Sequence, residues 1–282
     1  MCGIFGTTTI NAATRPFLPF LAICMEDRGK DSWGASDGTA CIRHLGPITH
    51  TWAEERGEIF AWERGIFHTR LASTGAVTPE NIHPFEQSGF VGIHNGQVFN
   101  HTQLNTRFNR TFTCDSQHIW AHLSQGLTLE DLRGYGNIAW FAPGDYALHL
   151  AWWSTYALEI AQLPTGEWVF ASTASALALA SNMLGVQLKY GTLQEGYEYT
   201  LVSGQEPTKG RLLHSCTSYE TAQVWGRRIW DFPSRPAAEV LGENACAHCG
   251  GKIYKSQYMC ARCFQEFYAD YKKYTLKKDV KA

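Results

Sequence analysis

The chain has 282 residues, which is enough for one large domain and a small additional module. Its hydrophobic share of 44% and aromatic share of 13% are typical of a packed globular protein and exclude disorder over most of the chain. No run approaches the roughly 18 apolar residues that a membrane-spanning helix needs, and no basic-then-apolar signal segment opens the chain. We therefore expect no membrane contact and a cytoplasmic location.

The net charge of −2 hides an asymmetry along the chain. Residues 252–282 carry 8 Lys and Arg against 3 Asp and Glu, whereas the rest of the chain is acidic. Two interpretations stay open: a solvated basic tail, or a docking surface for an acidic protein or a nucleic acid.

The first elements follow from local patterns. Alternating β-branched residues predict a strand over 2–10. Pro16, followed by apolar residues at helical spacing, predicts a helix over 16–26. Asn100, with Gln103 three residues later, predicts a helix N-cap. Short apolar runs predict four further strands, at 67–72, 90–94, 146–153 and 168–172.

The later part of the chain changes character. Small residues predict a helix over 174–184 that ends at Gly185. Pro and Gly then punctuate a connector over 206–244, within which 218–229 has a helical pattern. The mixture of strands and helices predicts an α+β protein.

Cys2 is the most informative single residue. If Met1 were removed, Cys2 would carry a free α-amine next to its thiol, and the two groups would form a nucleophile and base within one residue. A bare Met-Cys start also arises by chance, so the interpretation depends on the motifs that follow. In chain order these are Met1–Gly6, Arg28–Gly34, Phe67–Gly75, Asn81–Phe85, Ile93–Asn100 and Asp115–Gln117.

Taken together, these motifs resemble the class II glutamine amidotransferase domain, a group of the N-terminal-nucleophile (Ntn) hydrolases. The resemblance covers about residues 2–205, with weaker signals at Val169–Ser172 and Leu193–Tyr197. It implies an αββα sandwich, in which two stacked, mostly antiparallel sheets lie between layers of helices. It also implies hydrolysis of the side-chain amide of glutamine.

The resemblance assigns the reacting end of the site. Cys2 would be the nucleophile, and the Asn95 side-chain amide and the Gly96 N–H would stabilise the oxyanion. Arg28 would orient the nucleophile region. The alternatives are an ordinary Asn-Gly turn for the pair 95–96 and a structural ion pair with Asp31 for Arg28.

The resemblance also assigns the end that holds the amino acid. Arg70 would bind the α-carboxylate through its planar guanidinium, and Asp115 would pair with the α-ammonium. Ser73 and Thr74 would contact glutamine through backbone groups. The alternatives are a surface ion pair for Arg70 and a helix N-cap for Asp115.

Some residues depart from the family pattern or stay outside the site. Leu71 stands where some members have an aromatic residue, Thr74 where a histidine is frequent, and Gln117 where an acidic residue is usual. These changes concern the lid and the coupling to an acceptor more than amide hydrolysis. His68 and His94 are interpreted as structural, since lone histidines in strands are more often core groups.

Two C-x-x-C pairs near the C-terminus predict a metal site. Ten residues separate the pairs, and four thiolates in this arrangement fit tetrahedral Zn²⁺. A closed four-cysteine site is structural rather than catalytic, and the segment 245–282 resembles a zinc ribbon or treble clef with a basic helical tail. Redox or disulfide chemistry is the alternative. The predicted ligands are Cys246, Cys249, Cys260 and Cys263.

The first functional hypothesis is a glutaminase subunit that forms a γ-glutamyl thioester on Cys2 and delivers ammonia to a separate synthetase. About 75 residues follow the domain, too few for a typical second enzyme domain. Nucleobase modification, in a host cytoplasm if the protein is phage-encoded, is one use that would fit the basic tail. Two alternatives remain: a γ-glutamyl amide or peptide hydrolase with the same site, and a non-catalytic zinc-containing binding module.

Overall fold

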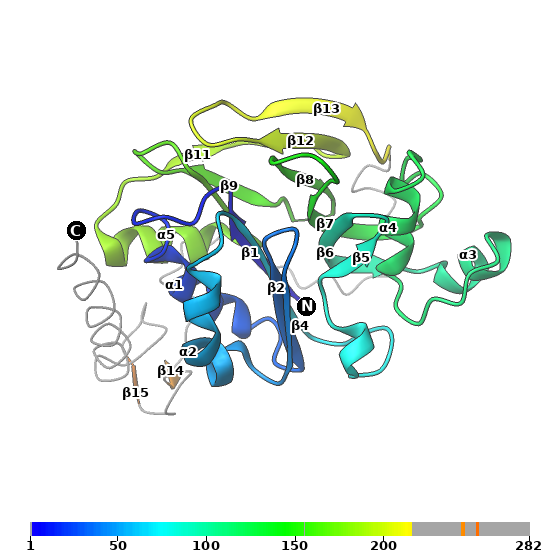
Figure 1. Ribbon diagram of the computed structural model, residues 1–282, viewed down its shortest axis with the longest axis horizontal. Helices are drawn as coiled ribbons and strands as arrows, with labels where there is room; N and C mark the ends of the chain where they lie inside the picture. Colours follow the sequence, from blue (N-terminus) through cyan, green and yellow to red (C-terminus); the bar gives the residue numbers. More distant parts are fainter. Residues whose placement is uncertain (1, 155, 216–243, 246–251, 254–282) are drawn as a thin grey trace. The chain divides into compact units, whose positions relative to one another are not determined.

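The computed structural model describes residues 2–154, 156–215, 244–245 and 252–253. The chain divides into two units, Met1–Arg228 and Ile229–Ala282. In the second unit, the structure describes one antiparallel pair of short strands, β14 (Asn244–Ala245) and β15 (Lys252–Ile253). All further description concerns the first unit (Figure 1).

Sheet A holds the N-terminal strand at its centre. Its seven strands are β1 (Gly3–Thr7), β2 (Ser32–Ser36), β3 (Cys41–Leu45), β4 (Gly65–Arg70), β9 (Glu159–Gln162), β10 (Trp168–Ala171) and β11 (Lys189–Gly191). They lie in the order β11-β9-β10-β1-β4-β2-β3, and every pairing is antiparallel. β1 is therefore hydrogen-bonded on both sides and is fully buried.

Sheet B is a second antiparallel sheet of six strands. They are β5 (Phe85–Gln87), β6 (Phe90–Val98), β7 (Gly134–Phe141), β8 (Leu148–Trp153), β12 (Tyr197–Leu201) and β13 (Thr208–Leu212). Their order is β13-β12-β8-β7-β6-β5, and the pairing of β6 with β7 is the longest in the fold. Residues 208–212, within the range expected for the connector, thus form the edge of this sheet.

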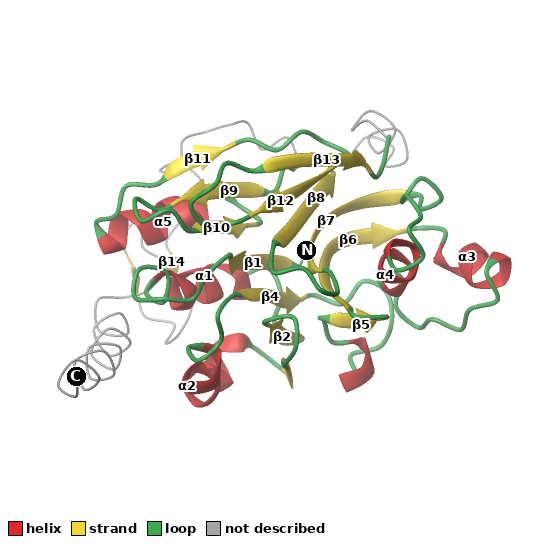
Figure 2. Ribbon diagram, turned by 45° about the horizontal axis from the view of Figure 1, so that its top comes forward, coloured by secondary structure: helices red, strands yellow, loops and turns green. Residues whose placement is uncertain are grey.

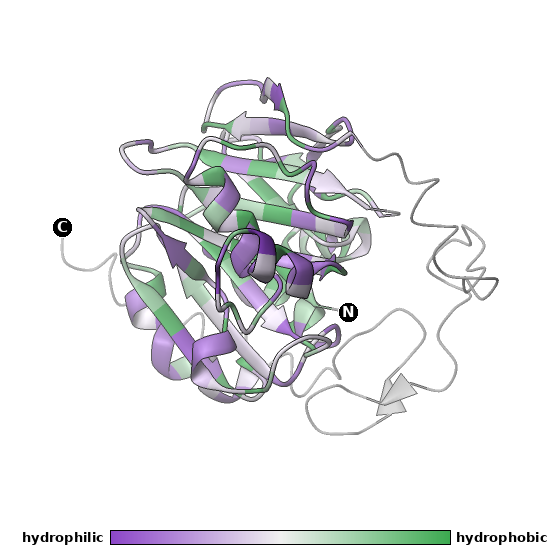
Figure 3. Cartoon of the chain, turned by 90° about the vertical axis from the view of Figure 1, so that its right-hand side faces the viewer, coloured by the Kyte–Doolittle hydropathy of each residue, from purple (hydrophilic) through white to green (hydrophobic). Residues whose placement is uncertain are grey.

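The two sheets pack face to face through apolar side chains. Ile4, Ile66 and Phe170 of sheet A form one buried cluster with Ile93 and Ala139 of sheet B. In Figure 3 hydrophobic and hydrophilic segments both occur along the strands, as expected for strands with one face in the core. This apolar interface holds the two sheets together.

Helices cover the outer faces of both sheets, as Figure 2 shows. The α+β prediction is therefore confirmed. α1 packs on β1 and against both α2 and α5, whereas α4 packs on β5 and β6. None of the helices in the described residues could cross a bilayer. The helices are α1 (Phe17–Glu26), α2 (Ile48–Ile59), α3 (His101–Arg107), α4 (Gln117–Leu123) and α5 (Ala174–Leu184), with a short 3-10 turn η1 (Pro79–Asn81).

Helix ends follow the sequence in one case and depart from it in another. α5 ends at Gly185, whose φ of 66° is the left-handed conformation that a terminal glycine provides. Asn100 occupies the predicted N-cap position of α3, but its side chain does not cap the helix. Instead, its amide bonds the Asp131 carbonyl and the Arg133 N–H, and it joins the helix to the loop before β7.

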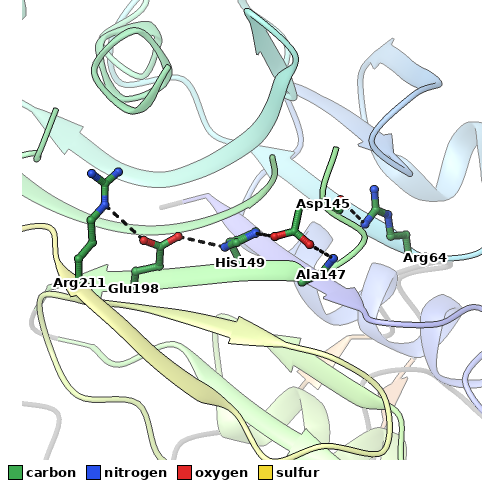
Figure 4. A network of polar contacts seen from close by, with 6 residues as sticks. All are labelled: Arg64, Asp145, Ala147, His149, Glu198 and Arg211. Carbon is green, nitrogen blue, oxygen red and sulfur yellow. Dashed lines mark hydrogen bonds and ion pairs between the residues drawn. The ribbon is translucent and has the colours of Figure 1, made fainter. Parts of the chain in front are cut away.

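A polar network runs across the far edge of sheet B (Figure 4). His149 on β8 lies between two carboxylates, with Asp145 and Glu198 each 3.0 Å from one ring nitrogen. Arg211 continues the chain of charges on β13, 3.4 Å from Glu198. Burial alone would raise the pKa of Glu198, but His149 and Arg211 hold it below its usual range. The network therefore ties β8, β12 and β13 together through charge.

Buried histidines make the fold sensitive to acid. Burial lowers the pKa of His68 to about 3 and that of His118 to about 4, so both are neutral in the folded chain at neutral pH. The unfolded chain takes up these protons below a pKa of about 6.5. Stability is therefore fully present above pH 6.5 and is lost as the pH falls towards the folded values.

We predict that the free energy of unfolding decreases from pH 6.5 to pH 4.5, by up to about 1.4 kcal/mol per pH unit for each such histidine. Urea denaturation at a series of pH values measures this slope. His68→Gln should make it shallower, while substitution of the exposed His50 with Gln should leave it unchanged. An unaltered slope in His68→Gln would show that His68 does not carry the effect.

Candidate active site

The Cys2 thiol lies at the end of the central strand. It directly precedes β1, and the Leu71 N–H points at Sγ from 3.4 Å, while Sγ lies 3.5 Å from the Leu71 carbonyl. Arg28 donates from Nε to the Cys2 carbonyl at 2.8 Å. The structure thus places Arg28 against the main chain of Cys2, which is the position that an orienting residue requires.

The segment that carries Arg28 crosses the end of β4. The Asp31 N–H bonds the Arg70 carbonyl at 3.0 Å, and the Asp31 carboxylate accepts the Ala72 N–H at 2.7 Å. A Cβ on Gly29 would fall inside contact distance of the Arg70 main chain, so only glycine allows this approach. The motif around Arg28 therefore holds the Arg70–Ala72 segment beside the thiol.

Arg70 is buried, so the surface ion pair considered for it is wrong. Only 3% of the residue is exposed. Its guanidinium donates to the carbonyls of Thr74 at 2.8 Å and Ala76 at 3.0 Å, which fixes the loop after β4. Within that loop Thr74 is half-buried and Ser73 is exposed. The predicted substrate-binding residues of this segment thus share one loop, and Arg70 organises it.

Asn95 and Gly96 lie inside β6, so the alternative of an ordinary Asn-Gly turn is wrong. They pair with Asn137 and Gly136 of β7. The Asn95 side-chain amide donates to the Ser172 hydroxyl at 3.3 Å. That hydroxyl also accepts the N–H of Ile4 in β1 at 2.8 Å. The oxyanion donors proposed from the sequence are thereby connected, through Ser172, to the strand that follows the thiol.

Asp115 is held by the strand rather than by a helix. Its Oδ2 accepts the Val98 N–H at 2.7 Å, and α4 starts with Ser116 at its N-cap, so the N-cap alternative for Asp115 is wrong. Ser116 in turn lies 2.9 Å from a ring nitrogen of His94. The carboxylate that was expected to hold the ammonium is therefore fixed to the same strand as the oxyanion donors.

The electrostatics bring these groups into one site. Burial raises the pKa of the Cys2 thiol, and the charge of Asp115 raises it further. The Leu71 N–H and the charge of Arg70 act in the opposite direction but do not outweigh the burial. The thiol is therefore neutral at neutral pH and needs a base before it can react.

His68 and His94 remain outside the chemistry. Both are buried, and the His68 ring bonds the His94 carbonyl at 3.0 Å. Burial lowers the pKa of each, so both rings stay neutral. The His68 ring ties β4 to the main chain of β6. The His94 ring lies on the other face of β6, against Ser116 and Trp153, so both are core groups.

Two residues that the sequence did not assign lie at this site. Ser172 ends the apolar run of β10 and connects β1 to Asn95. Tyr135 is the second residue of β7, and burial, together with the charge of Asp115, raises the pKa of its phenol. Tyr135 lies two residues before Asn137, so strand alternation places both on the same face. This could have indicated Tyr135 from the sequence only if the register between β6 and β7 had been known.

The predicted zinc ligands cannot be placed. Cys246, Cys249, Cys260 and Cys263 all lie outside the described residues. Within residues 2–154, 156–215 and the two short strands, no group of His, Cys, Asp and Glu side chains could hold a metal ion. The zinc site therefore stays a prediction from the sequence.

Gly96 leaves no room for a side chain. A Cβ there would fall well inside contact distance of the Tyr135 carbonyl oxygen, and of the His94 ring behind it. We predict that Gly96→Ala destabilises the fold by about 1–3 kcal/mol or more, because main chain cannot move aside as a side chain can.

Thermal unfolding checks the effect at Gly96. The matched control is Gly210→Ala in β13 of the same sheet, where a Cβ meets its nearest atom at 3.4 Å. It should unfold near the wild-type temperature. Equal unfolding temperatures for the two variants would contradict the prediction.

Comparison with known proteins finds amidotransferases among the relatives of this chain. No family model matches. The chain is 30% identical over 127 residues to an amidophosphoribosyltransferase of Archaeoglobus fulgidus, which is 41% of this chain and 28% of that protein. It is 31% identical over 166 residues to the glutamine–fructose-6-phosphate aminotransferase of Streptococcus pyogenes, which is 53% of this chain and 27% of that protein. The chain thus spans about a quarter of the length of these relatives.

The fold resembles that of a solved amidotransferase structure. The glutamine phosphoribosylpyrophosphate amidotransferase of Bacillus subtilis superimposes with a TM-score of 0.54 at 19% identity, over 75% of this chain and 49% of that one. The relatives found by sequence are class II glutamine amidotransferases, and the two antiparallel sheets with their helices resemble the Ntn amidotransferase fold.

Proposed function

We propose that this protein is a class II glutamine amidotransferase subunit that hydrolyses the side-chain amide of glutamine through a γ-glutamyl thioester on Cys2. The observation that supports it most is the convergence at one strand end. The charges of the buried Arg70 guanidinium and of the Asp115 carboxylate both act on the Cys2 thiol there. Arg70 and Asp115 have opposite charges, as the two charged ends of an amino acid require.

The first half of the reaction consumes the amide. Sγ of Cys2 attacks the amide carbon, and the developing oxyanion is stabilised by the Asn95 amide and the Gly96 N–H. The C–N bond then breaks, and the nitrogen leaves as ammonia with the proton that the thiol gave up. In the second half, water attacks the thioester carbon and the C–S bond breaks, which yields glutamate and the free thiol.

The base is the α-amine of Cys2 after Met1 is removed. Because burial raises the pKa of the thiol, the ionised form is scarce and an adjacent proton acceptor is needed. An α-amine has a reference pKa of about 7.7–8.0, so it can accept a proton at neutral pH. Arg28 supports this arrangement, since it fixes the Cys2 carbonyl on the other side of the residue.

A γ-glutamyl amide or peptide hydrolase is the second candidate. It would use the same residues with a larger leaving group. Leu71, next to the thiol, is 47% exposed, so this side of the site has no bulky cover within the described residues. The two candidates differ in substrate and not in mechanism.

We predict that the purified protein converts glutamine to glutamate and ammonia, and that Cys2→Ala abolishes this activity. Product analysis measures turnover, and intact mass measures the loss of Met1 and a transient γ-glutamyl adduct on wild-type protein. Cys41→Ala is the matched control, since Cys41 lies on β3 outside the site and should retain activity.

A γ-glutamyl peptide in a parallel reaction separates the candidates. Turnover of the peptide alone would favour the hydrolase. Turnover of glutamine by Cys2→Ala, or active protein that retains Met1, would refute the mechanism. The non-catalytic zinc-containing module would be supported if neither substrate reacted and Met1 were retained.

We further propose a structural Zn²⁺ held by Cys246, Cys249, Cys260 and Cys263. The short strands β14 and β15 bracket the first pair in the sequence, as in metal-stapled hairpins. We predict one zinc per chain by elemental analysis, and loss of that zinc in Cys260→Ser. Wild-type protein without zinc, or Cys260→Ser protein with a full complement, would contradict this.

The ammonia formed would pass to an acceptor enzyme on a separate polypeptide. The relatives' names include a phosphoribosyltransferase and a fructose-6-phosphate aminotransferase, so nitrogen transfer to an acceptor is a general use of this kind of site. The basic segment 252–282 would be the docking surface for an acidic partner or a nucleic acid, and nucleobase modification is one pathway that fits it.

A further inference from the structure

Tyr135 lies next to the oxyanion strand but has no role in the mechanism above. It pairs with Gln97 across the β6–β7 ladder, two residues along from the pair of Asn95 and Asn137. Residues directly opposite one another in an antiparallel pair, and residues two apart in a strand, share a face of the sheet. Tyr135 and Asn95 therefore project from the same face.

That face is the one that meets sheet A. Further along the same two strands, Ile93 and Ala139 pack against Ile4 in the cluster between the sheets. Asn95 reaches Ser172, which bonds Ile4. Tyr135 continues this face beyond the apolar interface, towards the end of β1 that Cys2 precedes.

The hydroxyl of Tyr135 is not used by the neighbouring residues that the structure describes. Within the described part of the chain, no group forms a hydrogen bond with it, although the edge of its ring is held against Phe99 at a centroid distance of 5.9 Å. Burial raises the pKa of this phenol, and the charge of Asp115 and, once its thiol is ionised, that of Cys2 raise it further, so the phenol stays protonated at neutral pH. A protonated phenol on the site face, partly exposed and with no hydrogen bond among the described residues, is free to contact a ligand.

The hydrogen-bonding groups that the site leaves unused show which end of the ligand Tyr135 would contact. An ammonium has three N–H donors. Oδ2 of Asp115 already accepts the Val98 N–H, and Oδ1 lies 3.6 Å from the Cys114 thiol, so the carboxylate alone cannot accept all three N–H groups of the ammonium. The γ-carbonyl, in contrast, already has the two donors Asn95 and Gly96.

We propose that the Tyr135 hydroxyl accepts a hydrogen bond from the α-ammonium of bound glutamine, beside Asp115. Tyr135 is then a substrate-binding residue that selects for a free α-amine. The inference rests on the proposed function and assigns a residue to the amino end of its substrate.

The test measures binding rather than turnover. In a Cys2→Ala background, calorimetry gives the Kd of glutamine and of glutaramate, which is glutamine without its α-amine. Tyr135→Phe should weaken glutamine binding about ten- to hundredfold, the usual loss for one hydrogen bond to a charged group, and leave glutaramate binding unchanged. The ring contact with Phe99 is kept in this variant, and Tyr190→Phe on β11, at the far edge of the other sheet, is the matched control.

The outcomes separate the inference from the function. Unchanged glutamine binding in Tyr135→Phe, or an equal loss of affinity for glutamine and glutaramate, overturns the inference about Tyr135. The proposed function still stands in that case if the wild-type protein hydrolyses glutamine. Failure of Cys2→Ala to bind glutamine, together with wild-type protein that hydrolyses none, overturns both.

Discussion

The site depends on one hydroxyl that joins the two sheets. Ser172 follows β10, accepts the Ile4 N–H of β1, and receives the Asn95 amide of β6. β1 fixes the position of the thiol, and β6 fixes the oxyanion donors. Without this connection the two sheets would still be held together by apolar contacts. These contacts are non-directional, so they do not fix the direction in which the Asn95 amide donates its hydrogen bond.

The partly buried thiol sets a further constraint. The same desolvation that strengthens every interaction of an oxyanion also disfavours the thiolate. A positive group at close range could offset this, but Arg70 is directed to the carbonyls of Thr74 and Ala76. In the proposed mechanism the α-amine of the same residue would resolve this conflict, since it accepts the thiol proton at the moment of attack.

Much of this could be predicted from the sequence, because local signals were strong where the elements are regular. The strand at β1, the helix α5 with Gly185, and the α+β class followed from periodicity and caps. Asn100 shows the limit of such local signals. Its residue type and position fit an N-cap, but its side chain bonds the main chain of Asp131 and Arg133 instead. Ser172 and Tyr135 could not be found in this way, since their meaning depends on strand register.

The change of polarity along β6 and β7 explains why the site lies where it does. On the face between the sheets, the pair Ile93–Ala139 is apolar, and the next pairs, Asn95–Asn137 and Gln97–Tyr135, are polar. Buried polar groups are stable only with partners, so a face of this kind must find them in the opposite sheet or in a ligand. Asn95 finds Ser172, and the Tyr135 hydroxyl finds no partner among the described residues. The change from apolar to polar pairs along β6 and β7 thus marks the end of the sandwich at which the core stops and the proposed binding site begins.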